Sequence, residues 1–313
     1  MSFQIKVPDE YDLLSSIHSW IYPDIQPVPE QTGDGYFGRV YNVDNKQVAL
    51  VIRQSKPGDV LQVNYSDPDA SQLNLKTLVQ WTLGLEINFK DALAQMSEDP
   101  VIAHLVNGVA GVRPYMSPTP YEALIKTIIQ QQVSYRAANI FTKRMVQGLA
   151  KPIFFEYKNW FNFPDAKTIT NTDKKILREF GFGYKVEYIH DTARLVAEGH
   201  LNVDSLVGVS YEEILAELTP IRGIGKWTVD VLSLAGLGDF SVFAYSDLVI
   251  QKILGKLYNH GERMTTKQVR EQSLTWGDSG TKVLYLLMSA EVLGLFDMAL
   301  QKTHKRLPVE EAD

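Results

Sequence analysis

The stretch from residue 218 to residue 230 reads LTPIRGIGKWTVD, and it holds the residues best suited to binding an anionic chain. Gly223 and Gly225 flank one isoleucine, and a backbone without Cβ atoms lets a partner come close. A helix that opens near Lys226 begins with N–H groups lacking an intrahelical partner, which can bind a phosphate. The spacing predicts a turn that grips a nucleic-acid backbone, with contacts from Arg222 and Thr228 as well. A purely steric turn is the alternative interpretation.

Asp247 is the candidate catalytic residue. It stands directly before an apolar helical pattern that begins at Leu248, so its carboxylate can accept backbone N–H groups and is stabilised in its ionised form. Such a carboxylate can stabilise the positive charge that develops on a sugar when an N-glycosidic bond breaks, and it can orient the attacking water. The same position is typical of a simple helix cap, so this alternative stays open.

The hairpin, the Lys226-Trp227-Thr228 sequence after it and Asp247 together resemble the helix-hairpin-helix superfamily of DNA glycosylases, in particular the bacterial 3-methyladenine DNA glycosylase II family. The segment 121–134, YEALIKTIIQQQVS, is similar to the helix of that family that ends in Gln-x-Val-Ser. The resemblance covers about residues 100–296. It implies excision of a damaged base from double-stranded DNA, after the base is flipped out of the duplex, with Asp247 as the catalytic carboxylate.

The resemblance also assigns roles to side chains around Asp247. Relatives that nick the DNA strand carry a lysine where this chain has Trp227, so the match implies a monofunctional enzyme that uses water and leaves an abasic site. Gln132 matches the position of a side chain that fills the gap left by the flipped base. The base pocket would be formed by Trp227, Tyr245, Trp276 and Tyr135. Relatives also hold a monovalent or divalent cation through hairpin carbonyls, which by position are those of Thr219, Ile221 and Ile224.

An alkylated purine is the expected substrate. Alkylation at N3 or N7 makes the base cationic and a good leaving group, and aromatic faces attract a cation. Aromatic residues make up 11% of the chain, enough for such a pocket beside the core. Ser279 stands where the family carries a second stacking aromatic, which affects the lesion range. Two alternatives are an oxidised-purine glycosylase and a non-catalytic helix-hairpin-helix DNA-binding protein.

Composition is consistent with a cytoplasmic protein, expected to be a monomer. The net charge is −6, but residues 111–190 hold 12 Lys and Arg against 6 Asp and Glu, so a local basic face can meet DNA. With no cysteine, the chain cannot form the cysteine-ligated iron–sulfur cluster of some relatives, and no cofactor is expected. The histidines show no zinc-site spacing, and the most apolar stretch, 283–296, is short for a membrane span.

The chain has two parts with different secondary-structure patterns. Residues 1–90 contain short β-rich runs at 3–7, 36–43, 47–53 and 60–65, with a turn at Asp44-Asn45, followed by a helical pattern over 71–85. From 91 to 306 nearly every segment has helical period, and residues 307–313 read as a frayed tail. The expected fold is α+β: a small antiparallel sheet domain, then an all-helical body of two subdomains that contains the hairpin.

Overall fold

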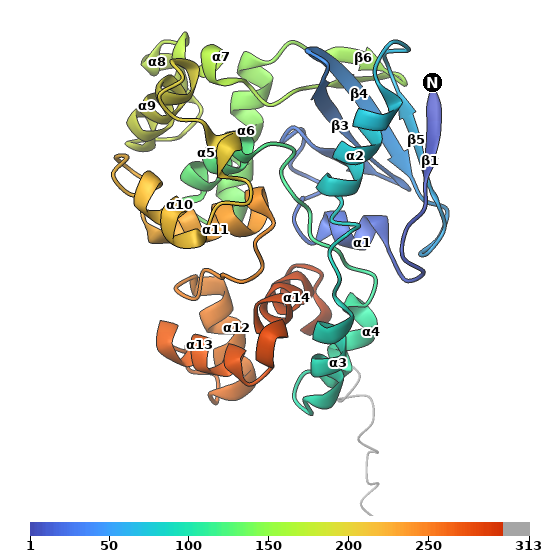
Figure 1. Ribbon diagram of the computed structural model, residues 1–313, viewed down its shortest axis with the longest axis vertical. Coiled ribbons are helices and arrows are strands. Elements are labelled where there is room, and N and C mark those ends of the chain that lie inside the picture. Colours follow the sequence, from blue (N-terminus) through green and yellow to red (C-terminus); the bar gives the residue numbers. More distant parts are fainter. Residues whose placement is uncertain (297–313) are drawn as a thin grey trace, which may run out of the picture.

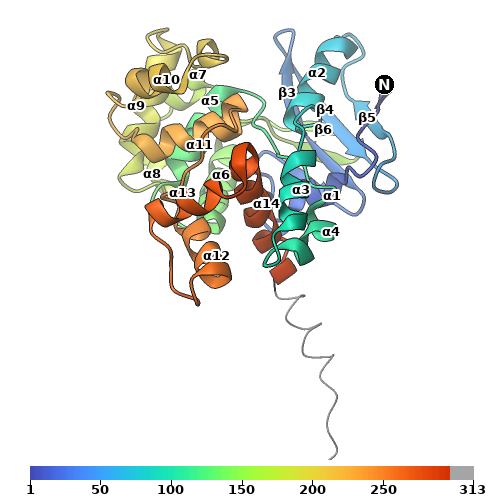
Figure 2. The same cartoon turned by 60° about the horizontal axis from the view of Figure 1, so that its bottom comes forward.

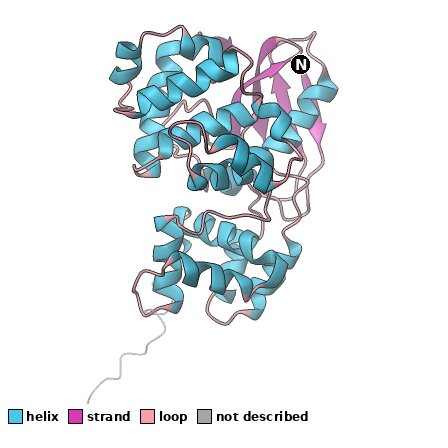
Figure 3. Cartoon of the chain, turned by 60° about the vertical axis from the view of Figure 1, so that its left-hand side comes forward, coloured by secondary structure: helices cyan, strands magenta, loops and turns pink. Residues whose placement is uncertain are grey.

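The computed structural model describes residues 1–296 of the 313-residue chain, so the expected tail and residues 297–306 of the expected helical body lie outside the described part. The α+β prediction is confirmed: an antiparallel sheet is followed by a predominantly helical body (Figure 3). The domain limit near residue 90 stays a prediction. Among the described residues, no helix combines the length and the apolar character that crossing a membrane requires.

The sheet has five strands in the order β1-β5-β4-β3-β2, all pairs antiparallel. They are β1 (Ser2–Ile5), β2 (Gln31–Gly33), β3 (Tyr36–Val43), β4 (Lys46–Arg53) and β5 (Leu61–Tyr65). The expected turn joins β3 and β4, where Asp44 and Asn45 have φ of 51° and 61°. Both positive angles match a tight hairpin turn, which short polar residues tolerate.

Both faces of the sheet are apolar, and each is covered by different elements. Alternate residues such as Leu50 and Ile52 face α1 (Leu13–His18) and α2 (Gln72–Thr82), in the core cluster shared with these helices. The alternate residues Ala49 and Val51 pack with Trp160 on the other face. Covering both faces explains why neither shows an exposed apolar patch.

Trp160 belongs to a hairpin that the sequence patterns did not indicate, because it interrupts the segment expected to be helical throughout. This hairpin, β6 (Ile153–Phe155) and β7 (Lys158–Trp160), lies at the upper edge of the sheet in Figure 1. The Trp160 ring fits against Gly38, where an added Cβ would come within 2.6 Å of the indole. The glycine is therefore required for this contact between sheet and helical body.

The helices form two groups, each with its own core. The first contains α5 to α11: α5 (Pro120–Gln130), α6 (Tyr135–Leu149), α7 (Ala166–Thr170), α8 (Lys174–Glu179), α9 (Lys185–Ala197), α10 (Tyr211–Leu218) and α11 (Lys226–Leu237). The second contains α3 (Lys90–Glu98), α4 (Val106–Val109), α12 (Leu248–Tyr258), α13 (Thr266–Leu274) and α14 (Gly280–Val292). Figures 1 and 2 show α3 and α4 beside α14, so early and late segments build this second group together.

A buried ionic cluster joins the sheet to the first helical group. Arg39 on β3, only 1% exposed, donates to Glu30 at 2.7 Å and to Glu122 on α5 at 2.7 Å. Lys126 donates to the same two carboxylates at 2.8 and 2.7 Å, and the Tyr115 hydroxyl donates to Glu30. Burial opposes ionisation of Glu122, but Arg39 and Lys126 hold the pKa of its carboxyl below its usual value. Two cations thus balance two carboxylates away from water.

We expect Arg39→Met to destabilise the protein by about 3–5 kcal/mol, because it leaves two buried carboxylates with one cation. The matched control is Arg53→Met, which breaks an ion pair with Glu156 at 2.5 Å whose arginine is 45% exposed. An exposed pair of this kind contributes about 0–1 kcal/mol. Urea denaturation of both variants checks the difference; equal losses would contradict the role of the cluster.

Candidate active site

The hairpin between α10 and α11 is a tight turn whose first glycine is required by the fold. Gly223 has φ of +91°, a conformation that L side chains rarely adopt. A Cβ there would lie 2.3 Å from the ring of Tyr188 on α9. The turn is closed by the Ile224 N–H, which donates to the Ile221 carbonyl at 3.0 Å. Gly223 is thus explained by internal packing.

Gly225 has no such internal explanation. Its φ is −111°, which any residue can adopt, and an added Cβ would meet nothing within 4 Å. Gly225 is the N-cap of α11, and no side chain caps the first-turn N–H groups. An exposed helix start with open space in front of it is suited to close approach by a phosphate. From the sequence alone the two glycines had the same predicted role. The structure shows that packing requires Gly223 but not Gly225.

The side chains that the sequence grouped with the hairpin do not all face solvent. Arg222 is exposed and lies over the Tyr188 ring at 5.6 Å. The Lys226 ammonium donates to Asp230 at 2.8 Å and to the Tyr211 hydroxyl at 2.6 Å. Thr228 is buried, and its hydroxyl accepts a hydrogen bond within the protein, so only its backbone N–H could meet a phosphate.

Asp247 and Trp227 lie side by side at the junction of the two helical groups. Asp247 caps α12, with Oδ1 accepting from the Val249 N–H at 2.8 Å. Its other oxygen, Oδ2, lies 3.4 Å from the Trp227 Nε1, a long contact. Asp247 is half-buried, and Oδ2 therefore retains capacity to accept a further hydrogen bond. The structure thus brings the predicted catalytic residue and a predicted pocket residue together; a catalytic role for Asp247 stays a prediction.

The loop after α5 connects to the hairpin through a residue that the sequence analysis did not select. Gln131 donates from Nε2 to the Gly223 carbonyl at 2.7 Å and to the Thr228 hydroxyl at 2.9 Å. In a run of three glutamines, no spacing tells which one turns inward. The neighbouring Gln132, the predicted wedge, is exposed with φ of +56°, and its Oε1 accepts from the Tyr184 hydroxyl at 2.8 Å.

A buried lysine on α9 holds the loop that follows α5. Lys185 on α9 is 3% exposed, and its ammonium donates to the carbonyls of Ile129 and Gln131 at 2.5 and 2.9 Å. Burial lowers the pKa of Lys185 to about 8. These bonds satisfy carbonyls that the end of α5 leaves free, so the positive φ at Gln132 is held by its surroundings.

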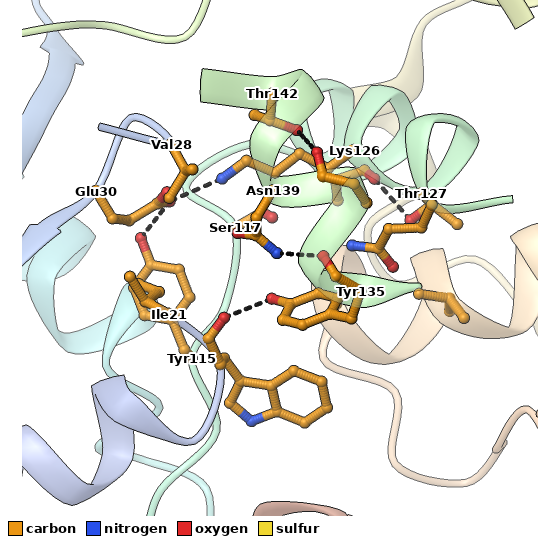
Figure 4. Close-up of a pocket in the computed structure, with 16 residues that line it drawn as sticks. Ile21, Val28, Glu30, Tyr115, Ser117, Lys126, Thr127, Tyr135, Asn139 and Thr142 are labelled. Carbon is orange, nitrogen blue, oxygen red and sulfur yellow. Dashed lines mark hydrogen bonds and ion pairs between the residues drawn. The ribbon is translucent and has the colours of Figure 1, made fainter. Parts of the chain in front are cut away.

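A cavity of about 100 Å³ lies along α11, much more than the roughly 10–15 Å³ that one water needs; neither Asp247 nor the predicted pocket residue Trp227 is among the residues that line it. Its lining includes Val231, which lies one helical turn after Trp227 and on the same face of α11. Tyr135, a predicted pocket residue, lines it from the start of α6 (Figure 4). Trp20 contributes another wall, with its ring 5.9 Å from that of Tyr135, and it was not found from the sequence.

Trp276 does not reach this cavity, so its prediction as a stacking residue is not supported by its position. It is 3% exposed in the core of the second helical group, and its Nε1 donates to Asp99 at 3.0 Å. Tyr245 is half-buried against the same core, 5.9 Å from the Phe243 ring, and does not line the cavity either. The matching of these two aromatics rested on sequence position, which cannot tell a core ring from a pocket ring.

The proposed cation ligands are three carbonyls of the hairpin. The Ile221 carbonyl already accepts the Ile224 N–H, while no backbone N–H of the described residues donates to the carbonyls of Thr219 and Ile224. Neutral carbonyl oxygens are the donor type that hard monovalent and divalent cations take. The donor set therefore fits such an ion.

Comparison with known proteins identifies the family that this chain resembles in sequence and fold. Residues 125–278 match the model of the HhH-GPD superfamily base excision DNA repair proteins. A Bacillus subtilis protein named as a candidate DNA-3-methyladenine glycosylase is 28% identical over 67% of this chain and 71% of its own length. DNA-3-methyladenine glycosylase 1 of Schizosaccharomyces pombe is 32% identical over 50% and 66%. A 3-methyladenine DNA glycosylase structure from Archaeoglobus fulgidus shares the fold, with a TM-score of 0.83, 22% identity and coverage of 93% and 98%.

The contrast between the two hairpin glycines gives a test. Gly223→Ala is expected to cost about 1–3 kcal/mol of stability, because it combines an unfavourable φ with a clash against Tyr188. Gly225→Ala is expected to change stability by less than about 1 kcal/mol but to weaken duplex DNA binding. Thermal unfolding and fluorescence anisotropy measure the two effects. Unchanged DNA affinity in Gly225→Ala would exclude close approach of the backbone at this point.

Proposed function

Because the chain belongs to the HhH-GPD superfamily of base excision DNA repair proteins and is a DNA glycosylase, we propose that it is a monofunctional enzyme that removes alkylated purines from duplex DNA. The bases are of the 3-methyladenine and 7-methylguanine type. The observation that carries the proposal is the Asp247 carboxylate at the start of α12, with Trp227 of the post-hairpin helix beside it. We also propose that the enzyme is a monomer, that it is cytoplasmic and that it needs no cofactor.

Asp247 acts in this mechanism through charge and position. As the bond between C1′ and the base lengthens, the sugar gains oxocarbenium character, and a nearby carboxylate stabilises it. The Val249 N–H holds Oδ1, which fixes the carboxylate, while Oδ2 has only the long contact with Trp227. Oδ2 is the atom that would orient a water for attack on C1′. An alkylated purine carries a positive charge and is already a good leaving group, so the enzyme needs to donate little or no proton to the base.

We expect no strand cleavage, because the side chain beside Asp247 is a tryptophan and not a lysine. A Schiff base with the sugar requires an amine at the position of Trp227, and an indole cannot form one. The amine of the adjacent residue, Lys226, is bonded to Asp230 and Tyr211. The enzyme would therefore release the base and leave an intact strand with an abasic site.

Two features support base flipping. Gln132 is exposed in a left-handed conformation that its surroundings hold, and such strained residues concentrate at functional sites. Its amide could fill the vacated space and bond the widowed base. The exposed start of α11 at Gly225 would hold the DNA backbone nearby, and a cation at the hairpin carbonyls would strengthen that contact.

Asp247→Asn is expected to lower the single-turnover rate of base release from methylated duplex DNA by about 10²- to 10⁴-fold. The asparagine keeps an acceptor for the Val249 N–H, so folding and lesion-DNA binding should persist. Asp173→Asn is the control, because Asp173 caps α8 through the same contact, from the Lys175 N–H, away from the site. Equal activity in parent and Asp247→Asn would remove Asp247 from the reaction.

A panel of duplexes distinguishes the lesion classes. Strands containing 3-methyladenine, 7-methylguanine, hypoxanthine or 8-oxoguanine are treated with enzyme, with and without alkali. We expect release of the alkylated bases and strand breaks only after alkali, because Trp227 stands where relatives that nick the strand carry a lysine. Preference for 8-oxoguanine would favour the oxidised-purine alternative. Breaks without alkali, or covalent trapping by borohydride, would contradict the monofunctional assignment.

A further inference from the structure

The cavity along α11 has two chemically different walls. Trp20 and Tyr135 form an aromatic wall. Glu30 and Lys126, here named the charged wall, lie on the loop before β2 and on α5, and Figure 4 shows them across from Tyr135. Aromatic faces are sufficient for stacking any purine, cationic ones included. Pairing with Arg39 and Glu122 offsets the cost of burying these two charges. The question that remains is which of their hydrogen-bonding positions the pairing leaves unused at the cavity.

Each member of the charged wall has one hydrogen-bonding position left over. Glu30, 1% exposed, accepts through Oε1 from Arg39, Tyr115 and Lys126, whereas Oε2 accepts no hydrogen bond from the described part of the chain. The Lys126 ammonium has three N–H groups and donates two of them, to Glu30 and Glu122. The wall thus presents an unused carboxylate acceptor next to an unused ammonium donor.

Charge attraction alone does not explain this wall. Arg39 and Lys126 balance Glu30 and Glu122, so the cluster has no net charge to attract a cationic base. An adjacent acceptor and donor instead complement the edge of a base that carries an N–H next to a ring nitrogen or carbonyl. Paired contacts of this kind are how proteins read base edges.

We propose that Glu30 and Lys126 read the edge of the flipped base, an inference that rests on the proposed function. Glu30 Oε2 accepts from an exocyclic amino or ring N–H group, and Lys126 Nζ donates to the neighbouring acceptor. The preferred substrates are alkylated purines that keep this edge free, such as 3-methyladenine. Purines whose edge is bridged, such as 1,N6-ethenoadenine, offer no N–H there and are poor substrates.

Glu30→Gln tests the acceptor. Arg39, Tyr115 and Lys126 all donate, so they hold the new amide oxygen in place of Oε1 and turn the amide N–H₂ toward the cavity. A donor then opposes the N–H of the base. Release of 3-methyladenine from methylated duplex DNA is expected to fall by about 5- to 150-fold, the range of paired base-edge contacts. Release of ethenoadenine should not change, so the ratio between the two lesions falls toward one.

Lys126→Arg tests the donor and is the second variant should Glu30→Gln fold poorly, because it keeps two cations for the two carboxylates while replacing the compact ammonium by a planar guanidinium whose N–H groups point elsewhere. The control is Thr142→Val, because Thr142 lines the same cavity but its hydroxyl donates to the Ala138 carbonyl within α6. Binding to a duplex with a tetrahydrofuran abasic site, which has no base, should be unchanged in all three variants. Thermal unfolding monitors the fold.

The outcomes separate the two claims. A parent enzyme that releases no base from methylated DNA overturns the proposed function itself. A parent that releases 3-methyladenine together with variants that match it overturns only the reading role. Equal losses on 3-methyladenine and ethenoadenine also overturn it, because they indicate a structural role. The parent enzyme can also prove inactive on ethenoadenine. In that case, variants that lose 3-methyladenine release but still bind the abasic duplex support the proposal. Variants that retain 3-methyladenine release contradict it.

Discussion

The buried ionic cluster of Arg39, Glu30, Glu122 and Lys126 is the interaction on which the arrangement of the molecule depends. It joins a strand of the sheet, the loop before β2 and the helix α5. Buried charges must be paired closely, so the partners cannot shift independently. This fixes the sheet against the end of α5, where the glutamine loop meets the hairpin. The amino-terminal part of the chain thereby contributes Trp20 and Glu30 to the lining of the cavity.

Around that fixed frame, the site is assembled from short segments that would not hold their shape alone. Gly223 is locked by Tyr188 and Gln131, and the glutamine loop is held by Lys185. Each contact satisfies a backbone carbonyl or fills a space that only glycine leaves. The uncapped helix start at Gly225 is therefore held in one conformation, and under the proposed function this lowers the cost of binding DNA there.

Much of the fold was accessible from sequence because it rests on local pattern. Short alternating or β-rich runs predicted β3, β4 and β5, and the apolar spacing over 71–85 predicted α2. The β6–β7 hairpin was missed because its three-residue strands are too short to show a period. Trp20, Glu30 and Lys126 were missed for another reason: they stand far from the hairpin in sequence, and no spacing links them to it.

The sequence by itself determined the local chemistry: a glycine turn before a helix, an aspartate at the start of the next helix, and a tryptophan in place of a lysine. These features depend on neighbours within one or two turns, so residue order is enough. Only the tertiary structure decided which aromatic rings reach a cavity and which, like Trp276, are core. It also decided that a buried charged pair faces that cavity. Both depend on long-range packing, which brings together residues about a hundred positions apart in the chain.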